Sequence, residues 1–235
     1  MSMRMASRIL LLAASAALLT ACPKPVRPPQ HAPAVPAAPV EIRDATVYEI
    51  DPLESTLHVL VYRGGALARL GHNHVMSVRK MQGRLWSHTT TANSGFDVSF
   101  PVAGMIVDDP EARRAAGSEF PPDVPDADRE ATRGNMLRAV LDAERFPVIT
   151  LRSVSIAGSP TNPQVMARIT IRNASRDVPL QPTVSIETDR LIVRGELDLL
   201  QSDFGIKPFS AALGALTVQD RLHVKFDVVA RRTKQ

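Results

Sequence analysis

The stretch from Tyr48 to Trp86, YEIDPLESTLHVLVYRGGALARLGHNHVMSVRKMQGRLW, decides the fold because it holds two strand patterns and the most unusual chemistry of the chain. Its first part alternates apolar with other side chains at period 2, as a β-strand with two different faces does: Leu57, Val59 and Val61 against His58, Leu60 and Tyr62. Gly64-Gly65 permits a turn, and a second extended run starts at Val75. Gly83 within that run predicts a bend, as a curved sheet requires.

Strand patterns recur through the rest of the chain. Apolar and polar side chains alternate in Phe96–Val102, Val165–Ile171, Arg190–Leu199 and Leu222–Val229, and Val148–Ile156 is extended. The sequence has neither βαβ alternation nor a glycine-rich phosphate loop, which disfavours parallel α/β folds. A count of about eight strands predicts a mainly β, antiparallel fold, either a barrel or a sandwich.

Residues 108–146 interrupt the strand patterns. Four apolar residues at helical spacing predict one short helix within residues 135–145: Met136, Leu137, Val140 and Leu141. The rest of this region is typical of a long loop. Asp108, Asp109 and Glu111 form an acidic cluster in it, and we expect a solvated turn there.

Residues 1–21 resemble the signal peptide of a bacterial lipoprotein. A basic start precedes the apolar run Ile9–Leu19, whose eleven residues are too few for a bilayer that needs ~20. Leu19-Thr20-Ala21-Cys22 resembles a lipobox, which makes Cys22 the lipidation site; the alternative is an ordinary secretory peptide with an incidental cysteine. Pro23 replaces the aspartate typical of inner-membrane retention. We therefore expect a periplasmic, membrane-anchored lipoprotein of the outer membrane.

Residues 22–45 are predicted to be a tether. Seven prolines lie within the seventeen residues Pro23–Pro39. Such a tract favours extended polyproline II at ~3.1 Å per residue, and the alternative is a proline-rich ligand for another domain. Cys22 is the one cysteine, so we expect no disulfide, and burial alone must stabilise the fold.

The composition excludes several classes of function. Hydrophobic residues make up 44% of the chain and charged residues 22%, as in ordinary globular proteins, while aromatic residues make up only 4%. The formal net charge of +4 falls to +2 without Arg4 and Arg8 of the predicted leader. No run of Lys and Arg is interleaved with aromatic residues, so we expect no nucleic-acid partner.

Several segments together resemble the YceI-like family of lipocalin-like periplasmic proteins that bind polyisoprenoids or related lipids. They are Tyr48–Pro52 with Ser55, Phe146–Leu151 with Ser153, Ile169–Arg172 before Val178–Leu180, and Ser202–Ile206. Together they cover nearly all of Val47–Ala230. The resemblance implies a domain over residues 46–232 that forms an eight-stranded antiparallel lipocalin-like barrel with one short helix and a long loop.

The same resemblance implies the ligand class, which is a polyisoprenoid, an isoprenoid quinone or a fatty-acyl chain. The chain departs from the family pattern at Gln201, where Arg is common, and at Thr132–Leu137. Gly71-His72-Asn73-His74 is also unlike the best-known members. These departures leave the fold expectation intact and the identity of the ligand open.

Eleven apolar residues are candidates for the lining of a barrel cavity. Strand alternation places them inward: Val59, Val61, Phe96, Val98, Phe100, Ile169, Leu191, Val193, Leu197, Val224 and Phe226. A long apolar ligand needs little more than continuous apolar surface along its tail and a few polar groups near the mouth. The alternative is that these residues fill a solid core and that the domain is an interaction module for envelope partners.

His72, His74 and Arg69 are the candidates for contact with the head group of a ligand. Two residues apart on a strand, the two imidazoles would point to one side, a spacing that also suits a metal ion. Hydrogen bonding within a turn is the third interpretation of these histidines. The candidates for a third metal ligand are His58, His88 and His223.

No catalytic nucleophile is evident. Ser202 precedes Asp203, but the chain has no Gly-x-Ser-x-Gly elbow, and an adjacent Asp is not a general-base arrangement. We therefore expect a binding protein rather than an enzyme. Its expected partners are a long-chain lipid and the membrane that holds the N-terminal anchor, with no cofactor except a bound polyisoprenoid or quinone.

Overall fold

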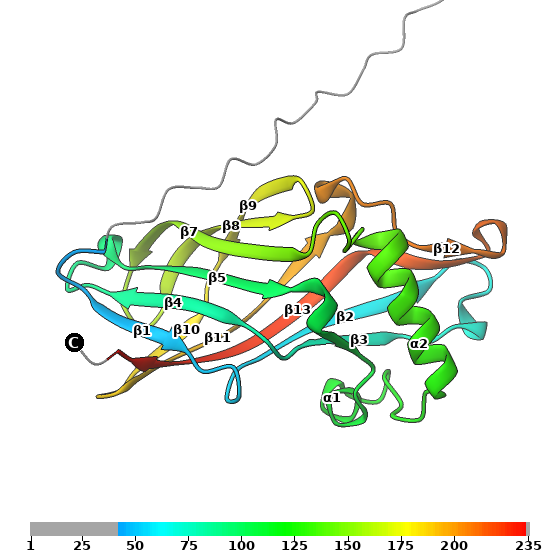
Figure 1. Cartoon of the computed structure of the whole chain (residues 1–235), viewed down its shortest axis with the longest axis horizontal. Helices are drawn as coiled ribbons and strands as arrows, with labels where there is room; N and C mark the ends of the chain where they lie inside the picture. Colours follow the sequence, from blue (N-terminus) through cyan, green and yellow to red (C-terminus); the bar gives the residue numbers. More distant parts are fainter. Residues whose placement is uncertain (1–41, 234–235) are drawn as a thin grey trace, which may run out of the picture. The chain divides into compact units, whose positions relative to one another are not determined.

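The computed structural model describes residues 42–233 (Figure 1). The predicted signal peptide, Cys22 and the predicted tether up to residue 41 lie outside the described residues. Residues 42–233 form thirteen strands: β1 (Thr46–Ile50), β2 (Thr56–Gly64), β3 (His74–Val78), β4 (Gln82–Ser87), β5 (Gly95–Pro101), β6 (Met105–Val107), β7 (Val148–Gly158), β8 (Pro163–Ile171), β9 (Ala174–Leu180), β10 (Thr183–Ile186), β11 (Arg190–Leu200), β12 (Ser210–Ala211) and β13 (Leu216–Arg232).

Helical segments are few in the described part of the chain. The α-helices are α1 (Pro110–Ala116) and α2 (Asp126–Asn135). Short helical turns are η1 (Ala68–Leu70), η2 (Thr91–Asn93), η3 (Val102–Gly104), η4 (Met136–Val140), η5 (Gln201–Phe204) and η6 (Ala212–Gly214). None of the described helices has the length and apolar character needed to cross a bilayer.

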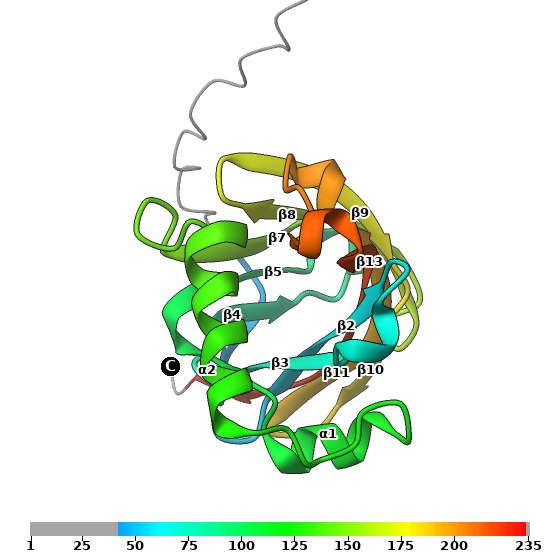
Figure 2. The same cartoon turned by 90° about the vertical axis from the view of Figure 1, so that its right-hand side faces the viewer.

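Strand β13 is the central strand of a single sheet and pairs with four other strands. It pairs with β2 and β1 along one edge and with β12 and β11 along the other. From β2 the sheet continues through β3 to β6, and from β1 through β4, β5, β7 and β8 to β9. All the pairs are antiparallel, which confirms the prediction of a mainly β, antiparallel fold. Figure 2 shows the strands curving around a common axis.

Hydrogen bonds do not close the sheet within residues 42–233. Strand β9 pairs with β8 alone, and β11 pairs with β10 and β13, so no ladder joins β9 to β11. A closed eight-stranded barrel therefore stays a prediction. The strand count is thirteen in residues 42–233, not eight: β6, β10 and β12 are short strands of two to four residues, and the ten longer strands also exceed the predicted number.

Strand β11 shows how alternation in the sequence becomes two faces of the sheet. Arg194, Glu196 and Asp198 are exposed, whereas the residues between them are half-buried. Two charged residues form ion pairs with β13 on the outer face, Arg194 with Asp227 at 2.7 Å and Asp198 with Arg221 at 2.9 Å. The inner face thereby remains free of charge along this strand.

Gly83 on β4 occupies a position that only glycine can adopt without strain. Its φ is 145°, a conformation that L side chains rarely adopt, and a Cβ there would clash with the backbone carbonyl of Asp97 on β5. The sequence predicts a bend at this glycine. Glycine is required at position 83 because the neighbouring strand β5 approaches too closely to leave room for a Cβ.

The prediction of one short helix within residues 135–145 is right for Met136–Val140, which are helical, but wrong in the number of helices and in where the helical segment begins. Helix α2 begins earlier, at Asp126, and continues into η4, which ends at Val140. Its sequence, DADREATRGN, is strongly polar and contains no large apolar side chain that would mark a core-facing helix. Helix α1 lies in the region predicted to be loop. Asp109 caps it by accepting hydrogen bonds from the N–H groups of Glu111 and Ala112, and Pro110 follows the cap.

Candidate functional site

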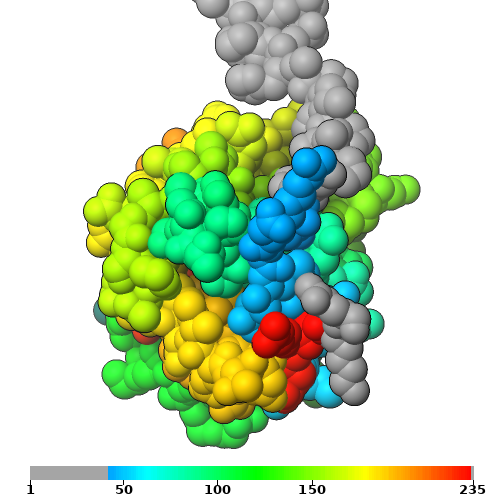
Figure 3. Space-filling model, turned by 90° about the vertical axis from the view of Figure 1, so that its left-hand side faces the viewer, coloured from blue at the N-terminus to red at the C-terminus, as the bar shows by residue number. Residues whose placement is uncertain are grey.

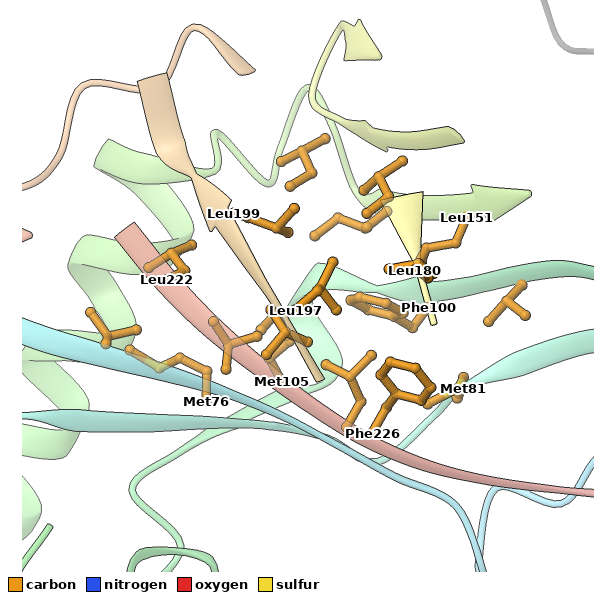
Figure 4. Close-up of a pocket in the computed structure, with 18 of the residues that line it drawn as sticks. Met76, Met81, Phe100, Met105, Leu151, Leu180, Leu197, Leu199, Leu222 and Phe226 are labelled. Carbon is orange, nitrogen blue, oxygen red and sulfur yellow. The ribbon is translucent and has the colours of Figure 1, made fainter. Parts of the chain in front are cut away.

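A cavity of about 560 Å³ lies inside the curved sheet. Most strands contribute to its wall, together with α2, η4 and η5. Figure 4 shows side chains from separate strands, such as Met76, Leu197 and Phe226, pointing toward one shared space. The volume falls in the range of about 300–1,000 Å³ that is typical of small-molecule sites. The interior is hollow, which argues against the solid-cored alternative.

The structure places all eleven predicted inward residues on the cavity wall: Val59, Val61, Phe96, Val98, Phe100, Ile169, Leu191, Val193, Leu197, Val224 and Phe226. The register explains why they meet. Val224 of β13 lies between Val59 on β2 and Leu197 on β11, so the three side chains share one face. Contact of these residues with a ligand stays a prediction.

Four methionines also line the cavity and are missing from the predicted set: Met76, Met81, Met105 and Met136. All four are buried. Unbranched thioether side chains adapt their shape, which suits a cavity that holds a flexible occupant. The inward position of Met76 could have been predicted, because Met76 on β3 pairs with the inward-facing Val59 on β2. Met136 could not have been found from strand alternation, because it reaches the cavity from η4.

Most polar lining residues come from α2, the residues that flank η1, the start of η5 and the start of β13, and these segments lie at the end of the sheet that faces the viewer in Figure 2. These polar residues are Tyr62, Arg63, His72, His74, Asp128, Thr132, Asn135, Gln201 and Thr217. A smaller polar set lies around the β4–β5 connection: Ser87, Thr91 and Ser94. Figure 3 faces the opposite end, where β1 and the ends of β13 and β10 pack side by side. The cavity is therefore asymmetric, with one strongly polar end.

A buried carboxylate fixes His74 at this polar end. Nδ1 of His74 lies 2.6 Å from Oδ2 of Asp108. Oδ1 of Asp108 accepts a hydrogen bond of 2.9 Å from the N–H of Val75 and one of 2.5 Å from Nη1 of Arg113. The side chains of Asp108 and Arg113 are fully buried, whereas 15% of the His74 side chain is exposed. One ring nitrogen is thus committed to Asp108, and the ring itself borders the cavity.

Arg113 holds this buried cluster together. Besides Asp108, it donates hydrogen bonds of 2.6 Å to the carbonyls of Asn73 and Pro121, and its guanidinium lies 6.0 Å from the ring centre of Phe120. The expectation of a solvated turn is therefore wrong for Asp108. The physical reason is that Arg113 in α1 supplies a buried counter-charge, which the acidic cluster alone does not reveal.

The environment of Asp108 keeps its carboxyl group ionised. Burial raises the pKa of Asp108, but hydrogen bonds from His74, Val75 and Arg113 and the charge of His74 outweigh burial, so the pKa lies below its ordinary value. A negative charge paired with Arg113 therefore lies directly behind the imidazole of His74.

The two predicted histidines meet at the cavity, but without a third metal ligand. The ring centres of His72 and His74 lie 6.3 Å apart, and both residues line the cavity. Residues 42–233 contain no group of three or more His, Cys, Asp or Glu side chains arranged to hold a metal. The proposed third ligands bond elsewhere: His58 to Ser77, His88 to Thr90 and His223 to Asp198. Arg69 is exposed on η1 and is not part of the lining.

The segment after β11 attaches η5 to β13 beside the polar end. Gln201 is buried and donates a hydrogen bond of 2.9 Å to the carbonyl of Gln219. Ser202 donates to Asp220 through its N–H and its hydroxyl, so its partner is not the adjacent Asp203. Gly205, at a φ of 67°, ends the helical turn. These contacts give Ser202 a structural role.

Comparisons with known proteins agree with this architecture. BcnA of Burkholderia cenocepacia has a similar structure, with a TM-score of 0.57, 15% identity, and coverage of 77% of this chain and 99% of BcnA. A polyisoprenoid binding domain from Saccharophagus degradans, implicated in plant cell wall breakdown, has a TM-score of 0.55, 12% identity, and coverage of 80% and 99%. At these identities the likeness shows the fold alone.

No match is found among curated proteins. The YceI-like domain family matches residues 48–230, which is well over half of the chain and includes nearly every strand described above. The chain therefore belongs to the YceI-like domain family.

Proposed function

We propose that this protein sequesters one long apolar chain, of polyisoprenoid, isoprenoid quinone or fatty-acyl type, in its internal cavity. The observation that carries the proposal is an apolar cavity of about 560 Å³ with polar residues gathered at one end. Membership of the YceI-like family and the description of the Saccharophagus degradans domain make a polyisoprenoid the first candidate.

The apolar wall would hold the tail of the ligand. Transfer of a hydrocarbon chain out of water stabilises the complex by ~25 cal/mol for each Å² of apolar surface. This term requires no specific partner, so residues such as Met76, Leu197 and Phe226 would be exchangeable among apolar types of similar volume. Small differences in tail length would therefore be tolerated.

The polar end would hold the head group. His74 is the best-placed contact, because Asp108 fixes its ring at the cavity wall and leaves the other ring nitrogen for a ligand. His72 lies beside it, and Arg63 is a further lining residue of this end. A quinone ring, hydroxyl, carboxylate or phosphate would each offer oxygen atoms to this set.

The proposed place of action is the periplasmic face of the outer membrane. Acylation of Cys22 with two or more chains would anchor the protein stably, and residues 22–45 would hold the domain away from the bilayer. From there the domain would store, transport or protect its apolar cargo.

A binding assay with a cavity-blocking variant tests the proposal. Val193 is a half-buried lining residue on β11, and Val193→Trp would fill the cavity. Val154 on β7 is an exposed valine outside the lining, so Val154→Trp is the matched control. The purified protein is incubated with a long-chain prenol or an isoprenoid quinone, separated from free ligand, and analysed for bound ligand by mass spectrometry.

The wild type and Val154→Trp should take up one equivalent of ligand, and Val193→Trp should take up much less while retaining the circular dichroism spectrum of the wild type. Absence of uptake by the wild type would overturn the proposal. Equal uptake by all three proteins would show that the ligand binds outside the cavity.

A further inference from the structure

Two neighbouring loops present exposed leucines beside the polar end of the cavity. We call these loops, residues 63–72 with η1 and residues 205–217 with η6, the leucine tip. Leu70 is 74% exposed, Leu67 is 41% exposed and Leu213 is fully exposed. A soluble surface rarely gathers large apolar side chains in this way, and such a patch commonly marks a site of interaction.

The two loops support each other, so the leucines lie on a defined surface. The N–H of Leu67 donates a hydrogen bond of 2.8 Å to the carbonyl of Ala215. Gly65, at a φ of 85°, lies so close to this carbonyl that a Cβ would approach its oxygen to 2.5 Å. Figures 1 and 2 both show the two loops side by side.

The backbone of the leucine tip is strained where it exposes Leu213. Ala212, Leu213 and Gly214 have φ values of 49°, 54° and 93°. Non-glycine residues rarely adopt this left-handed conformation, and a bulky leucine does so without the local hydrogen bond that an Asn or Asp could make. Strain of this kind, retained to expose an apolar side chain to water, points to a functional surface.

The leucine tip is continuous with the mouth of the cavity. Leu70 and His72 from the first loop and Ile206 and Leu216 from the second line the cavity wall. An apolar molecule at the tip would therefore meet Leu70, Ile206 and Leu216 of the lining directly.

The charge of the leucine tip is entirely positive. The two loops contain Arg63, Arg69 and Lys207, all exposed, and neither contains an Asp or a Glu. Exposed leucines flanked by cations match a bilayer surface that contains anionic lipid, where apolar side chains enter the interface and cations pair with phosphates.

We propose that the leucine tip docks on a lipid bilayer that contains anionic lipid and that the apolar cargo passes between bilayer and cavity at this contact. The second part rests on the proposed function, whereas docking does not. Docking explains why the tip exposes leucines at the cavity mouth: a long apolar chain that leaves a bilayer there avoids exposure to water.

Tryptophan quenching tests the docking. Leu213→Trp is prepared in the full chain and mixed with phosphatidylcholine vesicles that contain phosphatidylglycerol and brominated lipid. Leu53→Trp is the matched control, because Leu53 is 94% exposed in the β1–β2 loop beside Asp51 and Glu54. The chain's one native tryptophan, Trp86, is buried and contributes a common background.

Brominated lipid should quench Leu213→Trp strongly and Leu53→Trp weakly, and removal of phosphatidylglycerol should weaken the quenching at the tip. Equal quenching at the two positions, or none at Leu213→Trp, overturns the proposal. If quenching is absent and the chain sediments as a dimer that Leu213→Asn dissociates, the tip is instead an interface between two copies.

A transfer assay tests the passage of cargo. Leu67→Asn combined with Leu213→Asn removes apolar surface outside the lining, and Asn tolerates the left-handed backbone at position 213. Quinone uptake from anionic vesicles should slow about tenfold relative to Leu53→Asn, while uptake from detergent solution stays unchanged. An unchanged rate from vesicles contradicts the passage of cargo at the tip. Failure of the wild type to take up quinone from either source refutes the proposed function and leaves the quenching result as the test of docking.

Discussion

At the scale of single residues, Asp108 is the position on which the polar end depends. Asp108→Asn leaves the guanidinium of Arg113 buried without its carboxylate partner. Breaking a buried ion pair in this way is expected to lower the free energy of unfolding by about 3–5 kcal/mol. Asn tolerates the φ of 54° at this position, so backbone strain does not confuse the result. Urea denaturation measures the loss.

The control for this substitution is Asp198→Asn on the outer face of β11. Asp198 pairs with Arg221 and His223 in an exposed position, and exposed ion pairs contribute little to stability. Its replacement should leave the unfolding midpoint almost unchanged. Equal losses at the two positions would mean that the buried cluster stabilises the fold no more than a surface pair does.

The pH dependence of stability follows from the same residue. The pKa of Asp108 is lower in the folded protein than in the unfolded chain, so its ionised form contributes stability above the unfolded value of about 4. This contribution is lost as the pH falls through the folded-state pKa. The difference in free energy of unfolding between wild type and Asp108→Asn should be complete at about pH 7 and shrink below about pH 4. Denaturant titrations across this range measure it; a difference that grows on acidification would contradict the assignment.

Sequence reasoning succeeded at the residue scale where a single rule decides the environment. The inward position of Val59, Val193 or Phe226 follows from strand alternation alone, and the structure places each on the cavity wall. The burial of Asp108 could not be predicted from the sequence, because it depends on Arg113, which reaches Asp108 only when helix α1 packs against β3. The histidine pair was recognisable as unusual, but its fixation by Asp108 depends on a tertiary contact.

At the scale of elements, the close approach of β4 and β5 gives the sharpest prediction. Gly83→Ala places a Cβ against the backbone of Asp97 and Val98 and forces an unfavourable φ. We expect a loss of more than about 1 kcal/mol in the free energy of unfolding, because neither strand can shift without breaking ladder hydrogen bonds.

Gly134→Ala is the matched control. Gly134 lies in helix α2, where the nearest atoms to a new Cβ belong to the flexible end of Arg138. Alanine favours the helical backbone by up to about 1 kcal/mol over glycine, so this variant should be more stable than the wild type. Thermal unfolding compares the two. A stabilised Gly83→Ala would show that β4 and β5 are not held as closely as described.

Elements with a strong apolar period could be predicted, and the others could not. The long strands β11 and β13 can be recognised in the sequence because apolar side chains on one face of each strand alternate with polar side chains on the other. Helix α2 is polar on most of its surface and has no large apolar side chain, so the apolar pattern of a core-facing helix is missing from its sequence. The unpaired seam between β9 and β11 is a property of sheet curvature, which no local pattern encodes.

At the scale of the whole molecule, the predicted anchor and the domain can be separated by one substitution. Cys22→Ser removes the thiol that acylation requires, and no disulfide is disturbed because Cys22 is the one cysteine. The wild type should incorporate a labelled fatty acid in host cells and Cys22→Ser should not, with the circular dichroism of the purified domain unchanged. Equal incorporation by the two proteins, or none by the wild type, would refute lipidation of Cys22.

The central claim is that the cavity of about 560 Å³ is occupied by a long apolar chain in the cell. Native mass spectrometry of the protein purified from its own host tests this claim most directly. We predict a population heavier than the same protein under denaturing conditions by the mass of one polyisoprenoid, quinone or fatty-acyl lipid, which Val154→Trp retains and Val193→Trp lacks. A bare mass for the wild type, or an identical adduct on Val193→Trp, would contradict the account.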